Sequence, residues 1–105
     1  MTTNAQQAGT SWSALIEFDI ADPGDELHDT LFTLVQAHHG TPTTTTDTGH
    51  LALMLSVDAV GVVEATSRAV ALGTELLARA GHPGRTVMAV EIVTDQERDR
   101  RNAAS

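Results

Sequence analysis

The sequence predicts an α+β domain in which four antiparallel strands form one sheet and two helices pack on one face of it. Two adjoining stretches carry most of this prediction. Residues His50–Asp58 place apolar side chains at every second position, which is the period of a strand. Residues 59–80 repeat apolar and small side chains with the period of a helix. Because 105 residues have room for one core, we expect a single domain organised around this strand and helix.

The strand and the helix are expected to follow each other without a loop. Asp58 stands where a helix N-cap belongs, and Gly81 stands where a left-handed C-cap belongs. The strand residues expected in the core are Leu51, Leu53, Leu55 and Val57. The helix stripe expected to face the sheet comprises Ala59, Val62, Val63, Thr66, Ala69, Val70, Gly73, Leu76, Leu77 and Ala80.

The first part of the chain predicts one strand and one helix. Residues Trp12–Ile20 alternate between apolar and mixed side chains, which predicts a strand with one face in the core. A helix-start pattern follows, in which Asp22 can cap the helix and Pro23 suits its first position. Gly40 is expected to end this helix.

Two further strands complete the pattern. Residues Thr41–Asp47 are β-prone but have no apolar face, and Pro42 cannot donate a ladder hydrogen bond, so an edge strand is expected. The last strand, Arg85–Thr94, is expected to turn Met88, Val90 and Ile92 inward.

The resulting order, strand–helix–strand–strand–helix–strand, is the arrangement of ferredoxin-like domains. Right-handed crossovers then give the strand order 4-1-3-2, with both helices on one face. We expect residues 1–10 to be a disordered N-terminal tail, residues 11–94 to be the ferredoxin-like domain, and residues 95–105 to be a charged C-terminal tail with at most one short helix.

Charge and composition argue against several functions. The net charge is −8, which disfavours binding to nucleic acid or to an anionic membrane surface. The chain has no Cys for disulfides or thiolate ligands. No apolar stretch approaches the roughly 20 residues of a membrane helix, and the N-terminus lacks the pattern of a secretory signal. We therefore expect a cytoplasmic protein without a cofactor.

The helix-free face of the sheet is the first candidate binding surface. A contiguous apolar patch on a small domain marks an interaction site. We therefore expect a homodimer formed through this face or through an edge strand, with a partner protein or a small molecule as further ligands. The residues expected to form this surface are Leu15, Glu17, Met54, Val87, Ala89 and Glu91.

Glu17 and Glu91 are expected on neighbouring strands with both side chains on the helix-free face. Like charges directly opposite are unfavourable, so an Arg of a partner, a cation or a basic ligand would compensate them. A shared half-buried site could instead raise a pKa for acid/base chemistry. Two solvated carboxylates out of register are the simpler interpretation.

Three histidines form the second candidate site. His28, His50 and His82 are expected near one end of the domain, together with several Asp residues. Imidazoles and carboxylates are ligands for zinc or iron. No HxH, HxxxH or HxxE spacing joins two of them, so we expect no metal site.

The segments Trp12–Ile20, Leu51–Asp58 and Val90–Thr94 together resemble a small ferredoxin-like domain of uncharacterised proteins from high-GC Gram-positive bacteria. The resemblance covers roughly residues 11–100. In some of those proteins the domain precedes a helix-turn-helix segment, which implies a sensing or assembly module of a regulator. The chain stops at Ser105, before such a segment would begin, and it is acidic, so we expect no direct contact with nucleic acid.

The sequence carries no phosphate-binding glycine loop and no nucleophile elbow. We therefore expect a non-enzymatic interaction or regulatory domain that self-associates. The alternative is a dimeric α+β barrel enzyme of the cofactor-free monooxygenase or isomerase kind, with Glu17, Glu91 or a His as the acid/base group.

Overall fold

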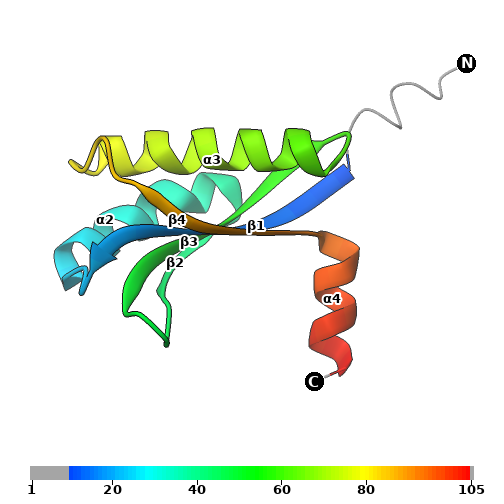
Figure 1. The fold of residues 1–105 in the computed structure, drawn as a ribbon, viewed down its shortest axis with the longest axis horizontal. Coiled ribbons are helices and arrows are strands. Elements are labelled where there is room, and N and C mark those ends of the chain that lie inside the picture. Colours follow the sequence, from blue (N-terminus) through cyan, green and yellow to red (C-terminus); the bar gives the residue numbers. More distant parts are fainter. Residues whose placement is uncertain (1–9, 105) are drawn as a thin grey trace, which may run out of the picture.

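The sheet is antiparallel throughout and has four strands, as Figure 1 shows for the computed structural model, which describes residues 10–104. The strands are β1 (Thr10–Ala21), β2 (Thr41–Thr44), β3 (His50–Ala59) and β4 (Val87–Thr94). Their order across the sheet is β2-β3-β1-β4, which read from the other edge is β4-β1-β3-β2. The expected N-terminal tail lies outside the described residues except for Thr10, which begins β1.

Helices lie on both sides of this sheet. The first strand is followed by helix α2 (Asp25–Val35) and the short 3-10 helix η1 (Gln36–His38), and the third strand is followed by helix α3 (Val62–Arg79). Figure 1 shows α2 and α3 above one face, whereas helix α4 (Asp95–Ala104) projects from the opposite side at one end of the sheet. No helix of the described region is long and apolar enough to cross a membrane.

The structure has a third helix beyond the two expected on the sheet, because most of the segment expected as a charged tail with at most one short helix forms α4. Its first turn is capped, since the backbone N–H of Glu97 donates to Thr94 Oγ1 at 3.0 Å. Glu97 also pairs with Arg100 and Arg101 one turn later, at 2.6 and 2.8 Å. A helix so rich in charge is stabilised by its cap and its own ion pairs and not by burial.

The core lies between the sheet and helices α2 and α3. The alternation expected in the first and third strands is confirmed, because their inward side chains are buried, except for Val57, which is partly buried. Helix α2 contributes Leu31 and Val35 to this core, and α3 contributes Leu76 and Leu77. The core residues from the two central strands are Ala14, Ile16, Phe18, Ile20, Leu51, Leu53 and Leu55.

Gly73 sets the distance between α3 and the sheet. A Cβ at this position would lie 3.0 Å from Ile16 Cδ1, 3.3 Å from Phe18 Cζ and 3.7 Å from Leu55 Cδ1. The helix backbone therefore rests directly on the side chains of the central strands. After the C-terminal end of α3, the expected left-handed residue is confirmed at Gly81, whose φ is +96°.

The start of α3 was predicted wrongly. Asp58 is not its cap, because β3 continues to Ala59 and Asp58 pairs with Ser11 of β1. Trp12 Nε1 also donates to the carbonyl of Ala59 at 3.0 Å, which holds this end of the strand against β1. The helix begins only at Val62, after Gly61.

This later start changes which residues of α3 face the core. Val62 and Val63, which were expected to face the sheet, are 51% and 81% exposed, and Val60 before them is 68% exposed. The buried face consists of Ala65, Ala69, Gly73, Leu76 and Leu77.

The first helix also begins later than predicted. Asp22 has a left-handed backbone with φ 51° and does not cap the helix, and Gly24 occupies the N-cap position. Residues 22–24 form the turn between β1 and α2, and Asp25 and Glu26 are the acidic residues of the first helical turn.

A bulge in β4 reverses part of its predicted orientation. Glu17 pairs with Ala89 but the next residue, Phe18, pairs with Val87, so Met88 is the extra residue of β4. Val87 therefore packs against the core, and Met88 is 52% exposed. The predictions that Val87 belongs to the open face and that Met88 points inward were both wrong.

Candidate functional site

The helix-free side of the sheet, called here the open face, brings five of the six predicted site residues together. Leu15 of β1 lies between Met54 of β3 and Glu91 of β4. Glu17, two residues further along β1, lies between Ala52 and Ala89. Val87 is the predicted residue that the bulge removes from this surface.

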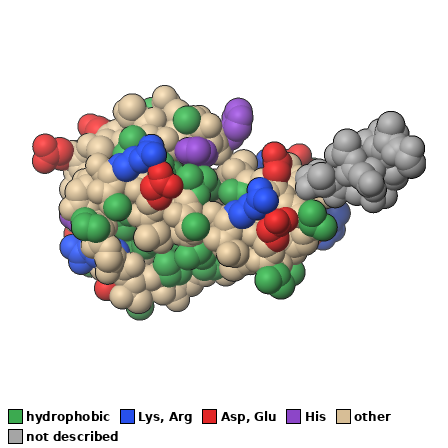
Figure 2. Space-filling model, turned by 90° about the horizontal axis from the view of Figure 1, so that it is seen from above, with side chains coloured by type: hydrophobic (Ala, Val, Ile, Leu, Met, Phe, Trp, Pro, Cys, Tyr) green, Lys and Arg blue, Asp and Glu red, His purple; other side chains and the backbone are tan. Residues whose placement is uncertain are grey.

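The helix-bearing side differs in character. Figure 2 views the molecule from above this side and shows acidic and basic side chains next to each other along it. Helix α3 carries two ion pairs between residues one turn apart, Arg68–Glu64 at 3.1 Å and Arg79–Glu75 at 2.5 Å. Their side chains are about half exposed, which is the ordinary pattern of a solvated helix surface.

Helix α4 is attached to one end of the open face by polar contacts. Asp95 accepts a hydrogen bond from the hydroxyl of Ser11. Arg98 Nη1 donates to Ser13 Oγ at 3.4 Å, and Arg101 Nη1 lies 3.8 Å from Glu91 Oε2. The contacts of α4 with the rest of the fold are therefore few and lie on β1 and β4.

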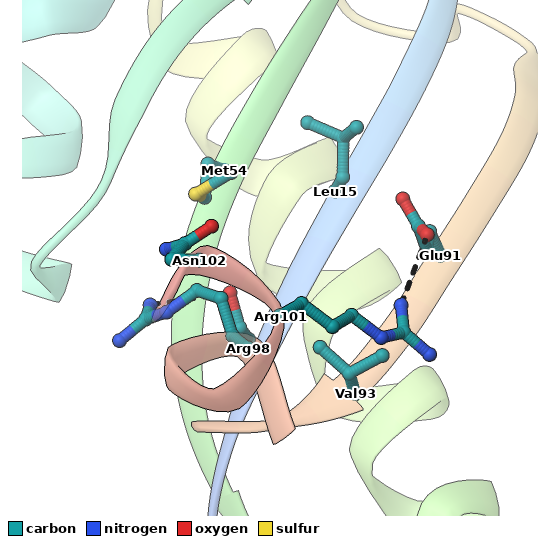
Figure 3. A pocket seen from close by; sticks show the side chains of 8 residues that line it. Leu15, Met54, Glu91, Val93, Arg98, Arg101 and Asn102 are labelled. Carbon is teal, nitrogen blue, oxygen red and sulfur yellow. Dashed lines mark hydrogen bonds and ion pairs between the residues drawn. The ribbon is translucent and has the colours of Figure 1, made fainter. Parts of the chain in front are cut away.

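A hollow of about 120 Å³ lies between α4 and the open face. Its floor is apolar and is formed by Leu15, Met54 and Val93, all half-buried. Figure 3 shows these three side chains on the strands, facing the side chains of α4.

The rim of the hollow is polar. Ser13 comes from the sheet. Figure 3 shows the other rim residues, which are Glu91 from the sheet and Arg98, Arg101 and Asn102 from α4. The sequence prediction included Glu91 but missed the three α4 residues. A signal for them existed, because Thr94 and Glu97 have the Thr-x-x-Glu spacing of a capping box, which marks a helix start.

A second polar group lies on the open face away from α4. Glu17 Oε2 is 2.8 Å from His50 Nδ1 and accepts a hydrogen bond from Thr48 Oγ1 at 3.0 Å. Thr48 Oγ1 is also 2.6 Å from Thr45 Oγ1. The pKa of Glu17 is lowered, first by the hydrogen bond with His50 and then by that from Thr48. The chain thus holds Glu17 as a carboxylate.

Glu17 and Glu91 do not share a site. They are offset by two residues along the sheet, because Glu17 is opposite Ala89 and Glu91 is opposite Leu15. Each also has its own partner, His50 for Glu17 and Arg101 for Glu91. The possibility that Glu17 and Glu91 share a site in which a carboxyl pKa is raised was wrong, since the pKa of Glu17 is lowered.

The three histidines are not part of a common cluster with metal-binding geometry. Within residues 10–104, no group of three or more His, Asp or Glu side chains is arranged to hold a metal ion. His50 pairs with Glu17 on the open face, so it belongs to that surface and not to a site with His28 and His82.

The outer edge of β4 borders the open face. β4 is the last strand of the sheet on its side, and β2 is the last strand on the other. β4 has eight residues with no Pro and one charged side chain, Glu91, whereas β2 has four residues and contains Pro42.

No protein-family model, no curated protein and no solved structure matches this chain. The resemblance to ferredoxin-like domains of high-GC Gram-positive bacteria therefore stays a prediction. A function has to be argued from the open face, the hollow and the β4 edge themselves.

Proposed function

We propose that this protein is a non-enzymatic interaction module that self-associates through the outer edge of β4. Two copies would pair their β4 strands in antiparallel orientation and form one continuous eight-stranded sheet. The observation that carries this proposal is the edge itself, which has eight residues, no Pro and a single charged side chain, Glu91. In natural proteins an edge that must remain unpaired carries Pro or several charged residues, is very short or is covered.

The other edge of the same sheet shows those protective features. β2 has only four residues, and its Pro42 lacks the backbone N–H that a ladder needs. On β4, by contrast, Met88 and Ala89 are exposed, and the single bulge lies near the beginning of the strand. The two edges therefore differ in the direction expected if β4 alone takes up a partner strand.

Association of two open faces has less support. Helix α4 projects from this side of the sheet (Figure 1), so two sheets could not stack without moving it. The same feature counts against the alternative of a dimeric α+β barrel enzyme, whose two sheets would pack through this face. The hollow of about 120 Å³ is also smaller than the roughly 300–1,000 Å³ of ligand pockets for drug-sized molecules.

Charge selects a register for the proposed strand pair. Residues directly opposite in an antiparallel pair lie on the same face, so Glu91 must meet an open-face residue of the second copy. A pair centred on Glu91 would place two carboxylates opposite each other, which is unfavourable. A pair centred on Val90 places Glu91 opposite Ala89 of the second copy instead. We propose this second register.

Ala89→Lys and Ala89→Glu test both the edge and the register. In a two-fold pair each substitution acts twice, and each cross-strand charge pair contributes about 0.2–1 kcal/mol. Ala89→Lys should therefore tighten the dimer about 2- to 30-fold and Ala89→Glu should weaken it by a similar factor. Thr43→Lys and Thr43→Glu on β2 are matched controls that change the net charge equally.

Sedimentation equilibrium gives the dimer dissociation constant of each variant. Hydrogen exchange followed by mass spectrometry should show that residues 87–94 become more protected as the protein concentration rises, while residues 41–44 do not. The proposal is wrong if the protein stays monomeric with unchanged exchange at all concentrations and with either Ala89 variant. If the Thr43 and Ala89 variants change the dissociation constant equally, the change is caused by net charge alone.

A further inference from the structure

Met88 is the most exposed sulfur-containing side chain of residues 10–104. Its side chain is 52% exposed, whereas Met54 on the open face is half-buried, and the chain has no Cys. A thioether is oxidised to a polar sulfoxide when an oxidant reaches its sulfur atom, and reductases reverse this change. Met88 is therefore the first side chain of the described region that a peroxide would modify.

The bulge in β4 explains why Met88 is exposed. Met88 is the extra residue between Val87, which pairs with Phe18, and Ala89, which pairs with Glu17. Val87 packs against the core, but Met88 does not belong to the residues that do so. A change in the polarity of Met88 therefore acts on the outer edge of β4 and leaves the core intact.

Met88 also lies within the strand pair proposed above, on which this inference rests. In the register centred on Val90, Met88 is two residues from the centre and lies beside Ile92 of the second copy. Ile92 is a partly buried apolar side chain. The flexible thioether of Met88 can pack against it, whereas a sulfoxide would lose water there without gaining a hydrogen-bond donor.

We propose that Met88 is an oxidation site that controls self-association, with the reduced thioether favouring the dimer and the sulfoxide favouring the monomer. Hydrogen peroxide transfers one oxygen atom to the sulfur of Met88, which loses two electrons, and the peroxide leaves as water. The coupling acts in both directions. Because the second copy covers Met88, dimer formation slows its oxidation.

Treatment of the purified protein with hydrogen peroxide tests the site. Trypsin cleaves after Arg85 and Arg98, so Met88 is released on a peptide without Met54, and mass spectrometry measures the oxidation rate of each. We expect Met88 to be oxidised faster than Met54, and more slowly as the protein concentration rises. Sedimentation equilibrium should show that oxidation weakens the dimer at least about tenfold, since two apolar contacts are lost. Treatment with methionine sulfoxide reductases A and B should restore it.

Three variants separate oxidation of Met88 from other effects of peroxide. Met88→Leu keeps an apolar side chain without sulfur, so it should form the dimer and retain it after peroxide treatment. Met88→Gln introduces a polar side chain and should weaken the dimer at least about tenfold without any oxidant. Met54→Leu is the matched control and should respond to peroxide as the wild type does. Far-UV circular dichroism should be the same for all three, because Met88 lies outside the core.

The proposal is overturned if the oxidised protein forms the dimer as tightly as the reduced protein, or if Met88→Leu is as sensitive to peroxide as the wild type. Either result with a stable dimer contradicts this inference and leaves the self-association proposal intact. A reduced protein that is monomeric at all concentrations contradicts the self-association proposal, and the control by Met88 is then wrong as well.

Discussion

Replacing Gly73 by Ala tests how closely α3 lies on the sheet. The added methyl group would lie 3.0 Å from Ile16 Cδ1 and 3.3 Å from Phe18 Cζ. These distances are shorter than the 3.5–4.0 Å at which carbon atoms attract each other best. The nearest atom is the end of a side chain, so Ile16 can move by a few tenths of an ångström, whereas a larger residue would require the helix to move.

Two opposing effects determine the change in stability. Ala is favoured over Gly inside a helix by about 1 kcal/mol. Overpacking a tight core costs about 1–3 kcal/mol, and a single methyl against a movable side chain should cost about 1.5–2 kcal/mol. We therefore expect Gly73→Ala to lower the free energy of unfolding by about 0.5–1 kcal/mol. Gly73→Val adds two more methyl groups in the same space and should lower it by about 2–3 kcal/mol.

Urea denaturation followed by far-UV circular dichroism, with the fluorescence of Trp12 as a second probe, measures these changes. Ala71→Gly is the matched control, because Ala71 is exposed on the same helix and reports the helix propensity without the contact. If Gly73→Ala stabilises the protein by as much as Ala71→Gly destabilises it, the space beside Gly73 is open and the reasoning is refuted.

Three further substitutions probe the open face, α4 and one tight turn. The hydrogen bonds of Glu17 lower its pKa from 4.5, so the ionised Glu17 stabilises the fold above pH 4.5 and this stabilisation is lost as the pH falls through the lowered value. The difference in urea midpoint between wild type and Glu17→Gln should therefore shrink below pH 4.5. Arg100 and Arg101 lower the pKa of Glu97 from 4.5 to about 2, so NMR signals of α4 should remain helical at pH 4 and change as the pH approaches 2, and Glu97→Gln should remove this transition. A Cβ on Gly40 would overlap the carbonyl oxygen of Met54, so Gly40→Ala should cost about 1–3 kcal/mol in the same denaturation assay. Gly24→Ala has open space around it and should cost much less.

The parts of the fold that sequence could predict are those set by periodic side chains. Leu51, Leu53 and Leu55 alternate strictly, and all three are fully buried in β3. The edge position expected from Pro42 also agrees with the observed place of β2. Such features depend on the spacing of side chains along the sequence, which is the same whatever segments pack nearby.

The parts that sequence missed depend on contacts between distant segments. Asp58 has the chemistry of a cap, yet pairing with Ser11 of β1 keeps it in the strand. The bulge that turns Val87 inward inserts one residue, Met88, and no local pattern of β4 marks it. A one-residue shift reverses every side chain beyond it, so a correct strand can still present the wrong face.

The candidate site shows the same division. The positions of Leu15 and Met54 on one face followed from alternation, and in the structure the two residues lie directly opposite each other. The pairing of Glu17 with His50 joins residues 33 positions apart, and only the assembled sheet brings them within 2.8 Å. Helix α4 was underestimated because the highly charged segment was expected to form at most one short helix, although its cap at Thr94 is encoded locally.

The junction between β4 and α4 has a mechanical consequence. The strand ends at Thr94 and the helix begins at Asp95, so no loop separates them. A helix of ten residues is about 15 Å long and behaves as a rigid arm. A rotation of about 10° at the end of the strand, which is within the normal variation of strand twist, displaces the far end of the arm by about 2.6 Å. A change in the twist of β4 is therefore amplified into a larger movement of the arginines of α4.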